Sequence, residues 1–156
     1  MRSGQLALGC SSPDSLARLH SIGNSSDMAV RIIQLGSPRQ PGEGIRVGTV
    51  RRPPRGVKRE DYAARDYFDV WLPLLSPQPE TIKLVQGDDR DKQWPRFVRR
   101  YRTEMSKSEP GRTLALLALF SRQTDFSVGC YCADPNYCHR SILKELLREA
   151  GAVLFE

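Results

Sequence analysis

The residues of this chain best suited to chemistry lie between positions 130 and 140, which read Cys-Tyr-Cys-Ala-Asp-Pro-Asn-Tyr-Cys-His-Arg. Three of the four cysteines and one of the two histidines fall within this segment. Thiol and imidazole groups can serve as nucleophiles, acids, bases or metal ligands. We therefore expect the functional site in this segment, with Cys138 and His139 as the candidate catalytic residues.

The segment is predicted to form the turn between a strand and a helix. Residues 125–132 alternate as in a strand, and residues 138–150 have the apolar spacing of a helix. Ligands of open α/β sheets bind at such turns, beyond the carboxyl ends of the strands. His139 and Arg140 would lie in the first helical turn, where free N–H groups and the helix dipole favour an anion. Arg140 is therefore a candidate ligand-binding residue.

The cysteines of this turn admit three interpretations. The helix dipole would favour a thiolate at Cys138, which could act as a nucleophile or a redox group. The residue types also suit zinc, although the spacing departs from the usual paired-cysteine motifs; the ligands would be Cys130, Cys132, Cys138 and His139. The third interpretation is that the thiols are only buried. The preferred hypothesis assigns no metal ligand, and the sequence identifies no cofactor.

A second basic segment follows another predicted strand, residues 45–50. The sequence Arg-Arg-Pro-Pro-Arg-Gly-Val over residues 51–57 presents several guanidinium groups on a loop that its two prolines stiffen. Such groups can bind an anion through paired hydrogen bonds. Arg51 and Arg55 are therefore candidate ligand-binding residues, and the alternative is a solvated basic loop.

The net charge of +6 is concentrated in two parts of the chain. Residues 31–60 hold eight Lys or Arg against two acids, and residues 91–122 hold eight against three. The second block includes a predicted helix with an apolar stripe from Trp94 to Met105 and several arginines on its other faces. Basic surfaces of this kind suit polyanions, so a nucleic-acid-binding module with structural cysteines is the alternative function.

The predicted fold is a single compact α/β domain over residues 28–156, with a small, mainly parallel sheet and helices on both faces. Residues 29–35 supply the first strand, and Trp71 is expected in the core. A break is expected at Pro110, and a buried helix at 113–122 follows it. Residues 1–27 lack a sustained pattern and are predicted to be a mobile N-terminal extension. The sequence leaves open whether translation starts at Met1 or at Met28.

The chain contains no apolar run long enough for a membrane span and no apolar N-terminal signal. We therefore expect a cytoplasmic protein without a membrane partner. Thiols of a cytoplasmic protein are normally reduced, which argues against disulfide bonds in the cysteine cluster.

Several separated motifs give the chain a family resemblance. They are the Arg-rich segment at 51–57, Tyr-Phe-Asp-Val-Trp-Leu-Pro at 67–73, Trp-Pro-Arg-Phe-Val-Arg-Arg-Tyr-Arg-Thr-Glu-Met at 94–105 and the Cys-His-Arg turn at 138–140. Together they resemble domain-of-unknown-function family 488, the YeaO-like bacterial proteins. The resemblance spans about residues 29–152 and implies a compact bacterial α/β domain without implying an activity.

These observations favour a pocket for a phosphorylated or otherwise anionic ligand, such as a nucleotide. In this hypothesis Arg51, Arg55 and Arg140 neutralise the ligand, and His139 or Cys138 acts as acid, base or nucleophile. The sequence does not decide whether the protein is an enzyme, and it leaves the substrate, the reaction and the oligomeric state open.

Overall fold

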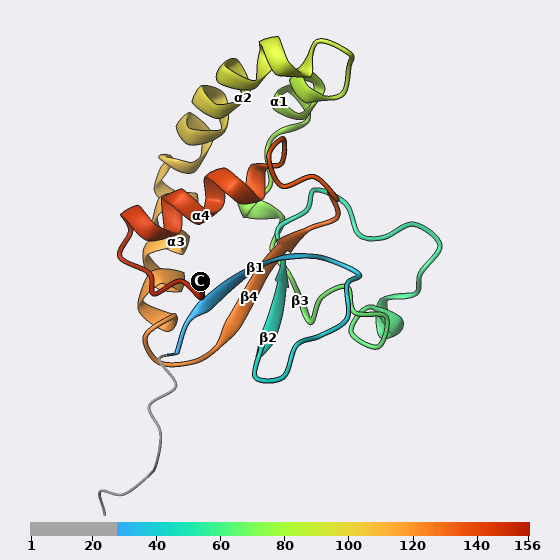
Figure 1. Cartoon of the computed structure of the whole chain (residues 1–156), viewed down its shortest axis with the longest axis vertical. Coiled ribbons are helices and arrows are strands. Elements are labelled where there is room, and N and C mark those ends of the chain that lie inside the picture. Colours follow the sequence, from blue (N-terminus) through green and yellow to red (C-terminus); the bar gives the residue numbers. More distant parts are fainter. Residues whose placement is uncertain (1–27) are drawn as a thin grey trace, which may run out of the picture.

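A four-stranded parallel sheet forms the centre of the protein. The structure is a computed structural model that describes residues 28–156, so the prediction of a mobile extension lies outside the described residues. The strands are β1 (Val30–Gln34), β2 (Ile45–Gly48), β3 (Val70–Trp71) and β4 (Phe126–Cys130). Their order is β1-β4-β2-β3, and every pairing is parallel (Figure 1). The prediction of a compact α/β fold with a mainly parallel sheet is confirmed.

The described residues also form helices of very different lengths. The α-helices are α1 (Pro79–Ile82), α2 (Arg90–Met105), α3 (Ser108–Phe120) and α4 (His139–Glu149), and the short 3-10 helices are η1 (Arg59–Asp61), η2 (Pro73–Leu75) and η3 (Lys83–Val85). None of the helices within residues 28–156 is long and apolar enough to cross a lipid bilayer. The predicted break at Pro110 is wrong: this residue lies in the first turn of α3, where a missing N–H costs little.

The long helices pack together against one face of the sheet. Val30, Val47 and Val128 point from the strands into this core, where they meet apolar residues of α2, α3 and α4. The predicted apolar stripe of α2 is confirmed by Phe97 and Tyr101, which are buried there. Figure 1 shows the long helices α2, α3 and α4 gathered on this side. The expectation of helices on both faces is therefore corrected: the long helices cover one face of the sheet.

The opposite face of the sheet is covered by loops and carries a buried ion pair. Arg46 of β2 and Glu43 are 0% and 2% exposed, and Arg46 Nε donates to Glu43 Oε1 at 2.5 Å. Ser127 of β4 also donates to Glu43 Oε1, and Arg46 Nη1 donates to the backbone oxygens of Ser37 and Asp66. Because a buried charge is costly unless it is fully paired, this network fixes the loop between β1 and β2 against the sheet.

Strand β3 lies at the edge of the sheet and is more exposed than the sequence indicated. Trp71 is 43% exposed, so the prediction that it belongs to the core is wrong. Its indole Nε1 donates to the backbone oxygen of Val50 at 2.8 Å. The Trp71 side chain therefore holds the residues that follow β2 through a hydrogen bond at the exposed edge of the sheet.

Glu43 predicts a specific loss of stability in acid. Burial disfavours its charge, but hydrogen bonds from Arg46, the Gln40 N–H and Ser127 outweigh burial and lower its pKa from 4.5 to about 2. The ionised form therefore stabilises the fold above pH 4.5, and this contribution is lost as the pH falls from about 4.5 towards 2. Urea unfolding across this range should show the loss.

The variant Glu43→Gln should be less stable at neutral pH by roughly 3 kcal/mol, because it leaves a buried guanidinium without its counter-charge. Its stability should also depend less on pH between 4.5 and 2. The matched control is Glu60→Gln, an exposed site. Equal pH dependence of the Glu43 variant and the wild type would contradict this role of the ion pair.

Gly129 is a position where the fold has no room for a side chain. A Cβ there would lie 2.8 Å from Leu35 Cδ2 and 2.9 Å from Ile33 Cγ1. Gly129→Ala should therefore lower the free energy of unfolding by about 1–3 kcal/mol through overpacking. Gly87→Ala is the control, since nothing lies within 4 Å of the added carbon. Equal stabilities of these two variants, measured by urea unfolding, would refute the tight packing beside β4.

Candidate functional site

The carboxyl ends of β1, β2 and β4 meet at one edge of the sheet because the strands are parallel. The Leu35 N–H donates to the Cys130 oxygen at 2.9 Å, and the Thr49 N–H donates to the Gly129 oxygen at 3.0 Å. A pocket of about 850 Å³ opens at this edge. Its walls come from the ends of these strands, the segment 76–86 around α1, and the start of α4.

The pocket brings together most of the predicted site residues. Arg51 and Arg55 line it from the loop after β2, and Cys138 and His139 line it from the start of α4. Arg140 does not line it and is instead buried, with 6% exposure. The structure thus joins the two segments that the sequence singled out, while the roles assigned to these residues stay predictions.

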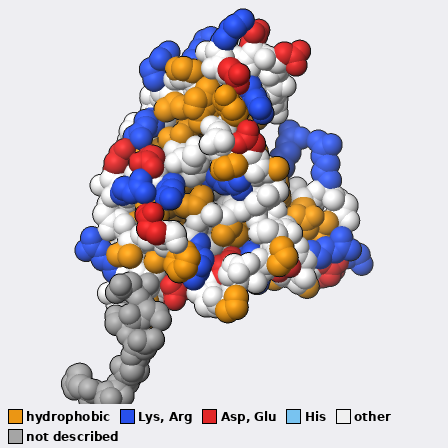
Figure 2. Space-filling view, viewed as in Figure 1, with side chains coloured by type: hydrophobic (Ala, Val, Ile, Leu, Met, Phe, Trp, Pro, Cys, Tyr) orange, Lys and Arg blue, Asp and Glu red, His pale blue; other side chains and the backbone are white. Residues whose placement is uncertain are grey.

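The Lys, Arg, Asp and Glu residues of the described part of the chain contribute to the pocket wall unequally: only Lys and Arg line it. The cations are Arg51, Arg52, Arg55 and Lys83, and no carboxylate lines the wall. Figure 2 shows Lys and Arg side chains projecting at the right, over the segment that follows β2, whereas basic and acidic side chains alternate over the helices. The electrostatic field inside the pocket therefore favours anions.

The arginines of the loop after β2 differ in how they are held. Arg51 Nη2 donates to the backbone oxygens of Ser76 and Pro77 at 2.9 and 3.1 Å, so it ties the loop to the opposite wall. Arg52 and Arg55 are exposed, and neither side chain has a hydrogen bond or ion pair to another described residue. Their guanidinium groups are therefore available to a ligand, whereas Arg51 shapes the pocket.

His139 is buried at the base of the pocket in a fixed orientation. Its Nε2 lies 2.8 Å from the Thr49 backbone oxygen, which can only accept a hydrogen bond, so Nε2 carries the proton. Burial lowers the pKa of His139 to about 4, so the ring is neutral at neutral pH. Nδ1 then has a free lone pair and lies 3.9 Å from the Cys138 sulfur. The Tyr101 ring packs edge-on against the imidazole.

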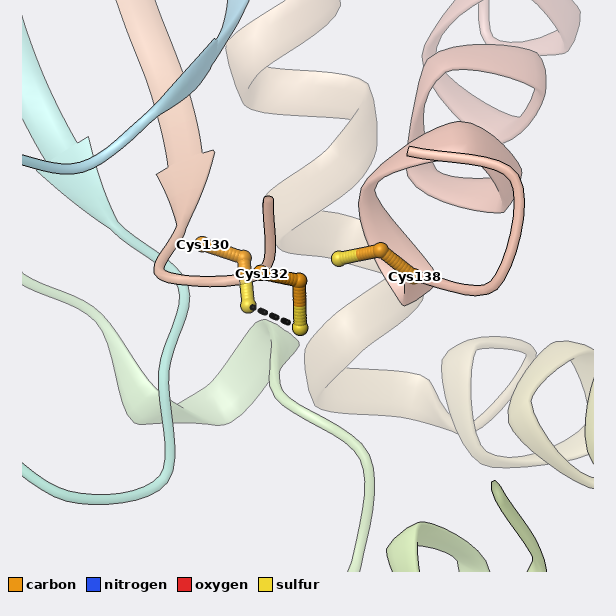
Figure 3. A group of neighbouring side chains, drawn as sticks. All are labelled: Cys130, Cys132 and Cys138. Carbon is orange, nitrogen blue, oxygen red and sulfur yellow. Dashed lines mark hydrogen bonds between the residues drawn. The ribbon is translucent and has the colours of Figure 1, made fainter. Parts of the chain in front are cut away.

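The three cysteine side chains converge beside this histidine. Their sulfur atoms all lie within 4.8 Å of one another, and Cys130 Sγ is 3.6 Å from Cys132 Sγ. Figure 3 shows Cys138 pointing from the start of α4 towards the pair at the end of β4. Cys130 and Cys138 are buried, whereas Cys132 is exposed in the pocket, and all three are free thiols.

The thiols differ in acidity because they share hydrogen bonds. The hydrogen bond from Cys130, the nearby Cys138 thiol and the charge of Arg140 lower the pKa of Cys132 well below its usual range. The hydrogen bond to Cys132 and burial raise the pKa of Cys130 to about 11, and the neighbouring thiols and burial also raise the pKa of Cys138. The exposed thiol is therefore the most acidic of the three.

Sequence reasoning overlooked part of the site. The preferred hypothesis gave Cys132 no role, and only the zinc interpretation named it, although its exposure next to a turn could have been anticipated. Thr49, which orients His139, has no recognisable sequence signal. Lys83 and the wall around α1 come from a segment far from both motifs, and only the folded chain brings them to the pocket.

The fold and this site define a small parallel α/β protein with a pocket at the carboxyl edge of the sheet. The family model DUF488-N3a, described as the active DUF488-N3 subclade, matches residues 30–151. The chain belongs to this DUF488 family, in agreement with the resemblance of its motifs. No curated protein and no solved structure matches the chain.

The exposure of the thiols predicts their order of reactivity. In native, chelator-treated protein, iodoacetamide should alkylate Cys132 faster than Cys130 and Cys138, because only Cys132 is exposed. Peptide mass spectrometry over a time course measures each rate. Protein unfolded in guanidinium chloride is the control, in which the three rates should become similar. Faster alkylation of Cys138 than of Cys132 in the native protein would contradict the arrangement of the cluster.

Proposed function

We propose that the pocket binds a small anionic ligand that carries a phosphate group, such as a nucleotide. The observation that carries this proposal is the charge of the pocket wall: four cationic side chains line it and no carboxylate does. Paired guanidinium groups bind phosphate oxygens with favourable geometry, and Arg52 and Arg55 are free of other described partners. The protein is thus a ligand-binding member of its family, with its site at the carboxyl edge of the sheet.

The rest of the wall suits the organic part of such a ligand. Tyr67, Tyr131, Tyr137 and Phe97 line the pocket together with several prolines. Aromatic and apolar surfaces with a few convergent polar groups are typical of small-molecule sites, and aromatic rings can stack on a base. The volume of about 850 Å³ accommodates a molecule of nucleotide size.

The base of the pocket supplies groups that could act on a bound ligand. His139 offers its Nδ1 lone pair, and the exposed sulfur of Cys132 lies in the pocket wall. The chain belongs to a subclade that is described as active, which supports a site that does more than bind. Cys138, a predicted catalytic residue, is 1% exposed, so its sulfur is less accessible to a bound ligand than that of the exposed Cys132.

The alternative function uses the arginines of α2 to bind nucleic acid. Arg99 and Arg100 are exposed and have no ion pair to a described residue, but Arg102 is paired with Glu149 at 2.9 Å. This helix therefore presents a smaller free charge than its sequence indicates. The pocket wall, with its uniform charge and a volume of about 850 Å³, favours a small ligand over a polyanion.

Arg55→Ala tests the proposed function. Loss of one charge-assisted contact of about 1.5–3 kcal/mol should weaken binding of pyrophosphate or adenosine monophosphate by roughly 10–100-fold. Isothermal titration calorimetry measures the affinities. The matched control is Arg59→Ala, an exposed arginine outside the pocket, which should bind as the wild type does. Wild-type protein that binds no phosphorylated compound, or equal affinities in the two variants, would contradict the proposal.

The salt dependence of binding separates the two functions. A small pocket neutralises few phosphates, so its affinity should fall gently with salt, whereas a nucleic-acid surface loses affinity steeply. Fluorescence anisotropy with a labelled oligonucleotide provides the comparison. Tight, steeply salt-dependent oligonucleotide binding that depends on Arg99 and Arg100 would favour the alternative.

A further inference from the structure

The three cysteines at the base of the pocket have the arrangement of a metal site. Tetrahedral zinc with Zn–S distances of about 2.3 Å holds its sulfur ligands roughly 3.8 Å apart. Cys130 Sγ and Cys132 Sγ are 3.6 Å apart, and the Cys138 sulfur lies within 4.8 Å of both. Small side-chain rotations would therefore place all three sulfurs around one ion.

The unpaired positive charge near the cluster also favours a negatively charged group there. Arg140 is 6% exposed, and its Nη1 is buried without a hydrogen-bond partner among the described residues. Its only described side-chain bond runs from Nη2 to the Ala133 oxygen. A buried guanidinium is costly without a counter-charge. Three thiolates around a divalent cation carry a net negative charge that would compensate it.

The surroundings meet the further requirements of such a site. Cys132 is exposed in the pocket, which gives the ion an entry path and leaves its fourth position open to the pocket. His139 is not one of the three ligands: it donates Nε2–H to the Thr49 carbonyl, so its Nδ1 keeps a free lone pair beside Cys138 at the edge of the cluster.

We infer that Cys130, Cys132 and Cys138 bind one thiophilic divalent ion, zinc, at the base of the pocket. Thiolate ligands select soft or borderline ions of this kind over magnesium or calcium. The three sulfurs supply three ligands, and the open position takes water or a donor atom from a bound ligand. The inference stands independently of the anionic-ligand proposal, since the sulfur geometry alone carries it.

The test is the metal content of the full chain, expressed without a tag in zinc-containing medium and purified anaerobically without chelator. Inductively coupled plasma mass spectrometry should find about one zinc per chain. Cys132→Ser removes an exposed ligand, so the variant should fold while its zinc affinity falls by more than about 100-fold, beyond what the loss of an outer partner costs. Cys10→Ser is the matched control and should retain zinc, because Cys10 is the one cysteine of the sequence that is not an inferred ligand.

A second readout uses cobalt as a spectroscopic substitute. Titration of chelator-treated protein with Co²⁺ should give thiolate-to-cobalt charge-transfer absorption and tetrahedral d–d bands in the wild type and not in Cys132→Ser. Circular dichroism confirms that the variant is folded. Wild-type protein without zinc and without these bands would overturn the inference. Equal zinc in the wild type and Cys132→Ser, or an isolated chain with a disulfide among the three cysteines, would also overturn it.

The same preparations separate this inference from the proposed function. Arg55→Ala should lose phosphate affinity and keep its zinc, because Arg55 supplies no ligand to the ion. Cys132→Ser should lose zinc whatever its phosphate affinity. Failure of one proposal is therefore visible without failure of the other.

Discussion

The position of β4 between β1 and β2 is the constraint on which the rest of the protein depends. All three strands run parallel, so their carboxyl ends are aligned, and β4 is buried along its whole length. Gly129 allows this close packing, since its neighbours leave no space for a side chain. The backbone bond from Leu35 to Cys130 then fixes where the cysteine segment leaves the sheet. The pocket exists because this exit lies beside the loop that follows β2.

Charged side chains form an ion pair on the loop-covered face of the sheet, whereas the arginines at the pocket have no partner of opposite charge among the described residues. The pair of Glu43 and Arg46 is neutralised within the loop-covered face, where a network of hydrogen bonds satisfies both groups. At the carboxyl edge the balance is different, because Arg52, Arg55 and the buried Arg140 have no carboxylate partner among the described residues. The first arrangement stabilises the fold, and the second leaves positive potential for a ligand.

Much of this organisation could be predicted from the sequence. Alternation and helical spacing predicted β1, β2, β4, α2 and α4, and the strand-to-helix turn was a strong indication of the site because its chemistry and its position in the fold agreed. Arg51 and Arg55 meet the cysteine turn as expected. Local patterns carry this kind of information because they reflect which face of an element is buried.

Other features depend on contacts between distant segments and had no local signal. Periodicity does not reveal that the helices share one face of the sheet, that Trp71 lies on an exposed edge strand, or that the wall around α1 closes the pocket. The burial of Arg140 likewise follows from the packing of α4, whereas its sequence position suggested a ligand contact. Cys132 gains its importance from the approach of Cys138, which lies on a different element.

A crystal structure of the full chain grown with pyrophosphate is the direct test of the carboxyl edge of the sheet as the ligand site. We expect pyrophosphate density inside the pocket, in contact with Arg55 or Arg52 and above His139. Density along the arginines of α2 instead, or a pocket that stays free of pyrophosphate at saturating concentration, would contradict it.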